Sequence, residues 1–216
     1  GYSWDEARDG IRFTTRVEGR RIPDYLRDLL ENARQLGADT PDGPPPPATL
    51  AQLRRRAQED DKRLDEVLRS EGYYNGSISS SVRQAQGGDF EAVYLVILGT
   101  RTMIETFDIV YSGHEGGGEG RPASGADLGL EPGKAATAQR IIDLTQKAVT
   151  TLQNNGYPQA KLDRRRVVID LSSSEAHVTL HISAGQRYVF GETRIGNPDG
   201  RTNPAYVREL LTFQQG

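Results

Sequence analysis

The chain contains no cysteine, and only one methionine and one tryptophan, among its 216 residues. The lack of cysteine excludes a disulfide-stapled scaffold, a thiolate metal site and a cysteine nucleophile. No run of about 18 apolar residues occurs, so the sequence predicts no membrane-spanning helix. The first residues have neither the basic head nor the apolar stretch of a secretory signal. If the protein is exported, we therefore expect this sequence to be part of the mature chain.

The chain also has no excess of basic residues: its net charge is −3 and its pI is near 5.7. Non-specific nucleic-acid binding needs a basic field, so we expect no nucleic-acid partner. Only 35% of the residues are hydrophobic, and the mean hydropathy is −0.63. This is lean for one large core but sufficient for two small domains, each of which buries one face of a sheet under helices.

The first hundred residues show a clear succession of strand and helix patterns. Alternating apolar residues predict a strand over 11–17, and Pro23 opens a helical pattern that continues to residue 36. A second helix is expected from Thr49, as N-cap, to Gly72. Two strands follow at 75–84 and 90–98. The first of these is rich in serine, which suits a sheet edge, whereas the second is apolar on nearly both faces, which suits a central strand.

The remaining residues repeat much of this pattern. A glycine-rich loop separates the first strand from the helix in this half. The expected elements are a strand over 104–111, the loop 114–126, a helix over 136–155, strands over 167–171 and 177–182, a further strand over 189–195, and a short helix after Asn203-Pro204.

Two short motifs recur at nearly the same offset. Leu68–Tyr73 reads Leu-Arg-Ser-Glu-Gly-Tyr and Leu152–Tyr157 reads Leu-Gln-Asn-Asn-Gly-Tyr, with the glycines 84 residues apart. Gly99–Arg101 and Gly185–Arg187 share the pattern Gly-x-Arg at an offset of 86 residues. Two anchors at one spacing indicate two copies of one unit. Because almost no linker separates the units, we expect them to hold a fixed angle.

These motifs resemble the POTRA repeats of the BamA/TamA superfamily of outer-membrane protein assembly factors. In that family a long helix ends in Leu-x-x-x-Gly-Tyr, a strand hairpin ends in Gly-x-Arg, and the next domain begins at once. The first repeat is most similar to TamA-like members, through the prolines 44–47, Asp60 in the second helix, and Leu68–Tyr74.

The resemblance implies an α+β fold of tandem POTRA domains. Each domain has the order β-α-α-β-β, with a three-stranded mixed sheet covered by two helices. The expected boundaries are residues 1–101 for the first domain, 102–187 for the second, and 188–216 for the first strand and helix of a third.

The resemblance also implies a role. Such domains are the periplasmic portion of an outer-membrane protein, and they bind partner or client polypeptides rather than catalyse a reaction. The expected partners are outer-membrane clients or inner-membrane proteins, together with a C-terminal β-barrel in the full-length protein and proximity to a membrane. Two alternatives stay open: the POTRA segment of a two-partner secretion transporter, and a POTRA-like envelope or division protein that only contacts partners.

Few residues offer catalytic or ligand chemistry. His177 and His181 share one face of a strand, but no nearby motif supplies the third ligand that zinc needs. The glycines at 116–120 lack the helix that a phosphate-binding loop requires directly behind it. No Ser/His/Asp arrangement is indicated. We therefore predict no enzyme, no cofactor and no metal.

Three charged features remain. Asp60 falls within an apolar helical stripe, so we expect its carboxylate to meet an arginine or backbone amides as a structural contact. The runs Arg54–Arg56 and Arg164–Arg166 could bind lipid head groups or an acidic partner. We interpret both as solvated faces, which is what most charge runs are.

The serine-rich strand is the candidate binding site. If it forms a sheet edge, its unpaired backbone N–H and C=O groups can accept an extended peptide by β-augmentation, and small side chains leave the backbone accessible. The alternative is a serine-rich edge protected by its neighbours. The predicted peptide-binding residues are Gly76, Ser77, Ile78, Ser79, Ser80, Ser81, Val82 and Arg83.

Overall fold

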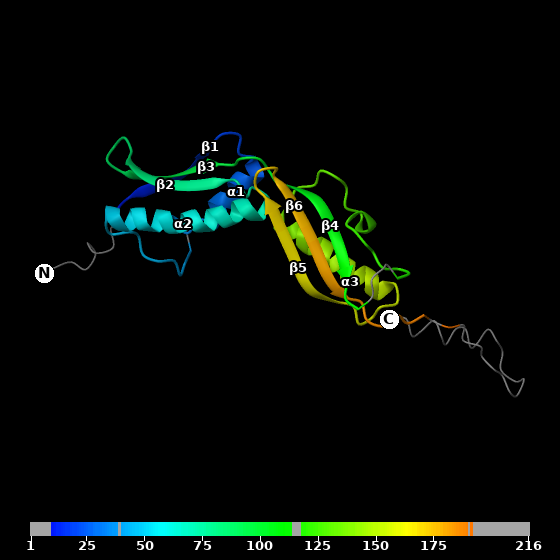
Figure 1. Cartoon of the computed structure of the whole chain (residues 1–216). Coiled ribbons are helices and arrows are strands. Elements are labelled where there is room, and N and C mark those ends of the chain that lie inside the picture. The colour runs from blue at the N-terminus through cyan, green and yellow to red at the C-terminus, as the bar shows by residue number, and fades with distance from the viewer. Residues whose placement is uncertain (1–9, 39, 114–117, 190, 192–216) are drawn as a thin grey trace, which may run out of the picture.

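The computed structural model describes residues 10–38, 40–113, 118–189 and 191, and within them the chain forms two α+β modules (Figure 1). Each module contains one three-stranded mixed sheet, with strand order β1-β3-β2 in the first and β4-β6-β5 in the second. In each sheet the last strand lies in the centre, parallel to the first strand and antiparallel to the second. The predicted central positions of residues 90–98 and 177–182 are confirmed.

The first module follows the predicted order of elements. Its core lies between the sheet and the two helices and includes Leu26, Leu64 and Tyr94, all fully buried. The elements are β1 (Phe13–Gly19), α1 (Asp24–Ala33), α2 (Leu50–Ser70), β2 (Ser77–Gln84) and β3 (Phe90–Ile97).

The ends of α2 are fixed by local hydrogen bonds. The Thr49 hydroxyl accepts from the Gln52 amide at 3.2 Å, and the Gln52 side chain accepts from the Ala48 amide at 2.9 Å, which forms a reciprocal N-terminal cap. At the other end Gly72 has φ of +91°, a left-handed conformation that glycine adopts without steric cost. The Tyr73 amide then donates to the Leu68 carbonyl at 2.8 Å, so the predicted helix boundaries are confirmed.

The second module has the same sheet topology with one helix fewer. Its elements are β4 (Met103–Tyr111), the 3-10 helix η1 (Ala126–Leu128), α3 (Ala138–Asn154), β5 (Lys161–Asp170) and β6 (Glu175–Ser183). The expectation of two α-helices in each repeat is therefore wrong here. The connection between β4 and α3 is rich in glycine, which disfavours a helix. Leu128, which is 2% exposed, inserts into the core from η1 instead.

Strand β5 begins six residues earlier than predicted, at Lys161 rather than Val167. The arginines 164–166 interrupt the apolar alternation from which the strand was predicted. As an edge strand, β5 needs no such alternation, because β6 holds its backbone on one side and most of its side chains face solvent.

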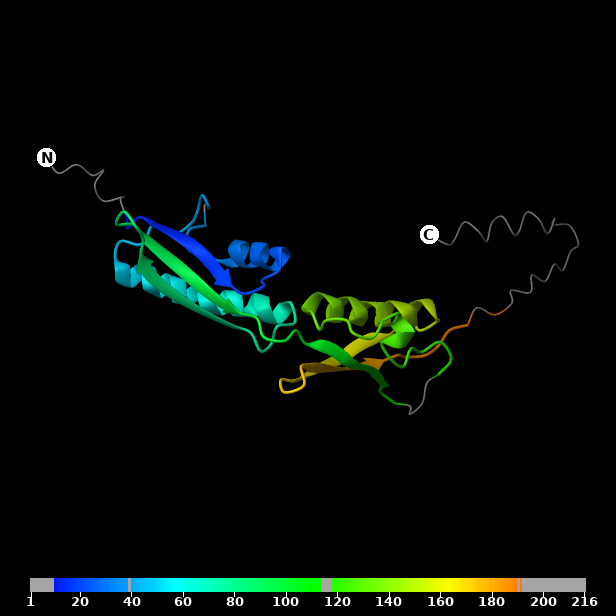
Figure 2. The same ribbon diagram turned by 90° about the horizontal axis from the view of Figure 1, so that it is seen from above.

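The two modules lie end to end and are joined without a linker (Figure 2). The Thr102 amide donates to the Gly72 carbonyl at 2.8 Å, and the Arg101 Nε donates to the Glu71 carbonyl at 2.9 Å. Across the same junction the Asn75 side-chain amide donates to the Leu171 carbonyl at 2.8 Å. These bonds order the short connection that the sequence predicted.

Several predictions lie outside or at the limit of the described residues. The strand expected over 189–195 and the helix expected after Asn203 fall largely or wholly in undescribed parts of the chain, and so does His114. Within the ranges that are described, none of the helices combines the length and apolar character needed to cross a bilayer.

Candidate docking surface

The predicted binding residues lie at the open edge of the first sheet. Gly76 directly precedes β2, and the other seven residues are part of that strand. Ile78 and Val82 pack against the core, whereas Ser77, Ser79 and Ser81 are exposed on the face away from the helices. The alternation that the sequence predicted for this strand is confirmed, and so is its place beside β3 on one side only.

The backbone of this edge is not wholly open, however. Helix α2 packs along β2. Its Asp61 side chain accepts from the Ser80 amide at 3.2 Å and from the Ser80 hydroxyl at 2.9 Å. The Ser80 N–H therefore points away from β3 and is bonded to a carboxylate. A peptide that pairs with β2 at this position has to take the place of Asp61.

Asp61 is itself incompletely paired. Its Oδ2 holds both contacts with Ser80, but its Oδ1 is buried and has no hydrogen-bond partner. This burial raises the pKa of the Asp61 carboxyl, against the opposing effect of its bonds to Ser80. A carboxylate in this position regains full hydration when it is displaced, so an incoming strand competes against a weakened contact.

Arg83 follows the exposed serines 77, 79 and 81 on the same face of β2. Its guanidinium pairs with Glu91 of β3 at 2.7 Å and with Glu18 of β1 at 3.1 Å. These pairs cross all three strands on the outer face of the sheet. The uncharged part of the candidate surface is thus the stretch from Ser77 to Val82.

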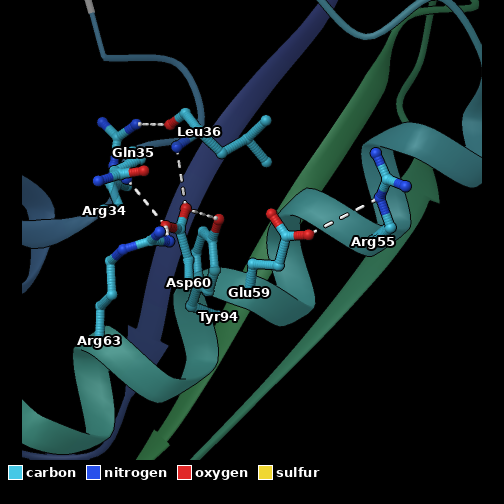
Figure 3. Close-up of polar contacts among 8 residues, drawn as sticks. All are labelled: Arg34, Gln35, Leu36, Arg55, Glu59, Asp60, Arg63 and Tyr94. Atoms are coloured by element: carbon cyan, nitrogen blue, oxygen red, sulfur yellow. Dashed lines mark hydrogen bonds and ion pairs between the residues drawn. The ribbon is translucent and has the colours of Figure 1, made fainter. Parts of the chain in front are cut away.

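Asp60, one residue before Asp61, has a different role (Figure 3). Its side chain is fully buried and accepts from the backbone amides of Gln35 and Leu36, both at 2.9 Å. It also accepts from the Tyr94 hydroxyl at 2.9 Å and from Arg63 at 3.0 Å. The predicted contact with an arginine and with backbone amides is confirmed.

This network ties together α2, the segment after α1 and the central strand β3. Burial, and then the negative charge of Asp60, raise the pKa of Tyr94 far above its ordinary value, so the phenol stays neutral and keeps donating. A cavity beside the network is lined by Pro44, Pro46, Pro47, Arg56 and Arg63, among others. Both oxygens of Asp60 already have partners, so its carboxylate is placed to stabilise the fold rather than to act as an acid or base.

The two histidines of β6 face outward. His177 contacts the Thr106 hydroxyl at 3.0 Å, and His181 contacts Arg164 at 3.2 Å. In the part of the chain that the structure describes, no group of three His, Cys, Asp or Glu side chains comes together as a metal site would require.

The sequence analysis did not single out the second open edge, β5. Residues 163–168 are all exposed, and α3 barely touches this strand. The position of the edge could have been found from the internal repeat, because β5 occupies in the second sheet the place that β2 has in the first. The arginine run hid the strand from the periodicity analysis.

Comparison with known proteins gives structural neighbours only. No protein-family model matches the chain, and no curated protein matches it. The similar solved structures include BamA POTRA3-5 from Haemophilus influenzae, at 15% identity and a TM-score of 0.38, over 92% of this chain and 76% of that one. They also include POTRA1-2 of the periplasmic domain of Omp85 from Anabaena, at 14% identity and a TM-score of 0.43, over 83% of this chain and 96% of that one.

A third similar structure is POTRA1-3 of the same Anabaena protein, at 15% identity and a TM-score of 0.43, over 92% of this chain and 74% of that one. The neighbours are thus POTRA domains of BamA and Omp85 proteins. Similarity at this level says nothing about what the present chain does.

Proposed function

We propose that this chain is a periplasmic scaffold and docking module of a TamA-like outer-membrane protein assembly and translocation factor. The observation that supports this best is the duplication. Two modules share one strand order, and each leaves its second strand at an open edge. The modules are joined directly by a backbone hydrogen bond from Thr102 to Gly72 and by a bond from the Arg101 side chain to the Glu71 carbonyl. An array of this kind presents several edges at set positions, which suits the guidance of polypeptides rather than the conversion of a small molecule.

The proposed binding mode is β-augmentation along residues 76–83. An extended client or partner segment adds to the first sheet beside β2, and its carbonyl replaces Asp61 as the acceptor for the Ser80 amide. Main-chain hydrogen bonds supply most of the affinity in this mode, and the small serines impose little side-chain selectivity. The site therefore accepts many sequences, which an assembly factor needs.

The second proposal concerns the end of the described chain. The Tyr188 amide donates to the Gly156 carbonyl at 2.7 Å, and the Arg187 Nε donates to the Asn155 carbonyl at 3.3 Å. These bonds repeat those of Thr102 and Arg101 at the first junction. From this repetition we propose that a third POTRA domain begins directly after Arg187, where the sequence analysis expected it.

Two variants of the first edge test the binding mode. Asp61→Ala leaves the Ser80 amide available and should strengthen the binding of an extended peptide. Ser80→Pro removes the same amide and should abolish binding at that position. Both variants lose the contact between Asp61 and Ser80, so each controls for the stability effect of the other. Peptide titration followed by backbone amide shifts would measure both. Equal binding by both folded variants would rule out docking along β2.

A further inference from the structure

Strand β5 has a more accessible edge than β2. Its backbone pairs with β6 on one side, and among the described residues no other segment bonds to the backbone of 161–170. Helix α3 does not run along it in the way that α2 runs along β2. Val167 is 38% exposed and Val168 is 42% exposed, so both faces of the strand are open to solvent. An added strand meets no competing carboxylate here.

The same edge is strongly basic. Arg164 and Arg166 lie on the outer face of the sheet, opposite His181 and Thr179 of β6. Arg165 lies between them and points to the helix side. In the described part of the chain, none of the arginines 164–166 has a carboxylate within ion-pair distance. Three neighbouring positive charges on one strand therefore remain uncompensated.

The two carboxylates on the same strand are engaged elsewhere. Asp163 accepts from the Ser183 hydroxyl. Asp170 accepts from the Ser172 hydroxyl at 2.6 Å and from the backbone amides of Ser173 and Ser172 at 3.3 and 2.9 Å, and these bonds lower its pKa. Neither side chain is therefore placed to neutralise the arginines.

We infer that β5 is a second docking edge, which adds an extended polypeptide segment with acidic residues at alternate positions. This inference extends the proposed docking role and rests on it. Arg164 and Arg166 are two positions apart, about 7 Å along the strand, which is also the spacing of alternate residues in an added strand. The carboxylates of such a segment lie opposite the two arginines, where opposite charges attract across neighbouring strands.

The helix-side face of β5 presents Arg165, Val167 and Ile169, and Ile169 packs against the core. Apolar side chains of the added strand opposite Val167 and Ile169 extend this apolar surface. A second copy of the chain is a poor occupant, because β5 against β5 brings the two arginine rows together. The chemistry that fits is an alternation of acidic and apolar residues.

A capped seven-residue peptide of alternating glutamate and valine is the probe. Added to the whole chain, it should shift the backbone amide resonances of residues 161–170. The double variant Arg164→Gln/Arg166→Gln should weaken binding about tenfold, as expected for the loss of two cross-strand charge pairs. Arg54→Gln/Arg55→Gln makes the same charge change on the exposed face of α2 and should leave the affinity within about twofold, since charges this far from the site are screened.

Three further experiments distinguish strand addition at β5 from binding by charge alone, docking at β2 and binding to a lipid surface. A peptide methylated on alternate backbone nitrogens should not bind if main-chain pairing is required. If it bound with the same affinity as the unmethylated peptide, binding would depend on charge alone and the inference would be wrong. Shifts confined to β2 would overturn this inference and leave the proposed function intact. Vesicles containing phosphatidylglycerol that bind through Arg164 and Arg166, with no response to the peptide, would overturn it in favour of a lipid surface.

Discussion

The two modules share a sheet topology but differ in how they hold the segment between the first strand and the long helix. In the first module this segment contains α1, and the buried Asp60 network fixes its end. In the second module a loop with η1 takes its place, and Arg121 fixes the loop by lying between the rings of Tyr111 and Tyr157, 5.2 and 4.9 Å from their centres. The comparison shows that the sheet and one long helix define the unit, and that the first helix is replaceable.

Removal of the Asp60 carboxylate should have the largest effect. Asp60→Ala leaves the amides of Gln35 and Leu36 and the Tyr94 hydroxyl without their acceptor. We expect the first module to lose about 3–5 kcal/mol of unfolding free energy. Urea unfolding should show an early transition that the second module does not share.

Asp65→Ala is the control for this experiment. Asp65 lies on the same helix and forms a partly exposed ion pair with Arg69 at 3.2 Å. Its removal should cost less than about 1 kcal/mol. If Asp65→Ala and Asp60→Ala were equally mild, α1 would not depend on the buried carboxylate, and the contrast between the modules would fail.

Removal of Arg121, which holds the corresponding segment of the second module, should reduce stability less than removal of Asp60. Arg121→Ala removes two cation–π contacts that hold the loop before α3, and we expect a loss of about 1–3 kcal/mol. The buried Arg121 Nε has no hydrogen-bond partner, which offsets part of the gain from stacking. Hydrogen exchange should quicken at Leu128 and Leu130, whose amides are bonded within the loop. Unchanged exchange at both would contradict this prediction.

The junction should respond more weakly still. Arg101→Ala removes one hydrogen bond to the Glu71 carbonyl and the stacking on Tyr73, worth about 1 kcal/mol. The angle between the modules should then vary more. Because the chain has no cysteine, spin labels at Arg54→Cys and Lys147→Cys can report the distance between α2 and α3. Arg187→Ala, at the far end of the second module, should leave that distribution unchanged.

The last effect appears only at alkaline pH. Burial raises the pKa of Tyr111 to about 12, and its hydroxyl donates to the Pro122 carbonyl. A raised pKa stabilises the fold fully below the ordinary value near 10, and this contribution is lost as pH rises toward 12. Tyr111→Phe should remove that part of the pH dependence. Difference absorbance of the phenolate would measure it, and ionisation at the ordinary pKa would contradict it.

Much of this arrangement could be predicted from the sequence, for identifiable reasons. The nearly continuous apolar run of 90–98 marks a central strand, and the paired motifs around Gly72 and Gly156 mark a duplication. Asp60 within an apolar stripe predicts a satisfied buried charge. Each of these signals depends on residues close in sequence, so periodicity and composition reveal them.

Other features could not be predicted in this way. The contact between Asp61 and Ser80 depends on how α2 is rotated about its axis against β2, which no local pattern encodes. The early start of β5 was missed because the periodicity signal arises only where one face of a strand is buried. Docking along residues 76–83 stays a prediction, because its test requires a bound segment.

If both edges dock polypeptides as proposed, the direct junction between the modules affects how strongly a long client is held. While the hydrogen bonds of the junction keep β2 and β5 at one separation, a polypeptide that pairs with one edge holds its next segment at a high local concentration near the other. The second binding step then becomes intramolecular, and the overall affinity can exceed that of either edge by a factor of about 10²–10⁴. The gain is greatest when the intervening chain matches the separation of the edges. The junction would thereby select clients by the spacing of their strands as well as by their sequence.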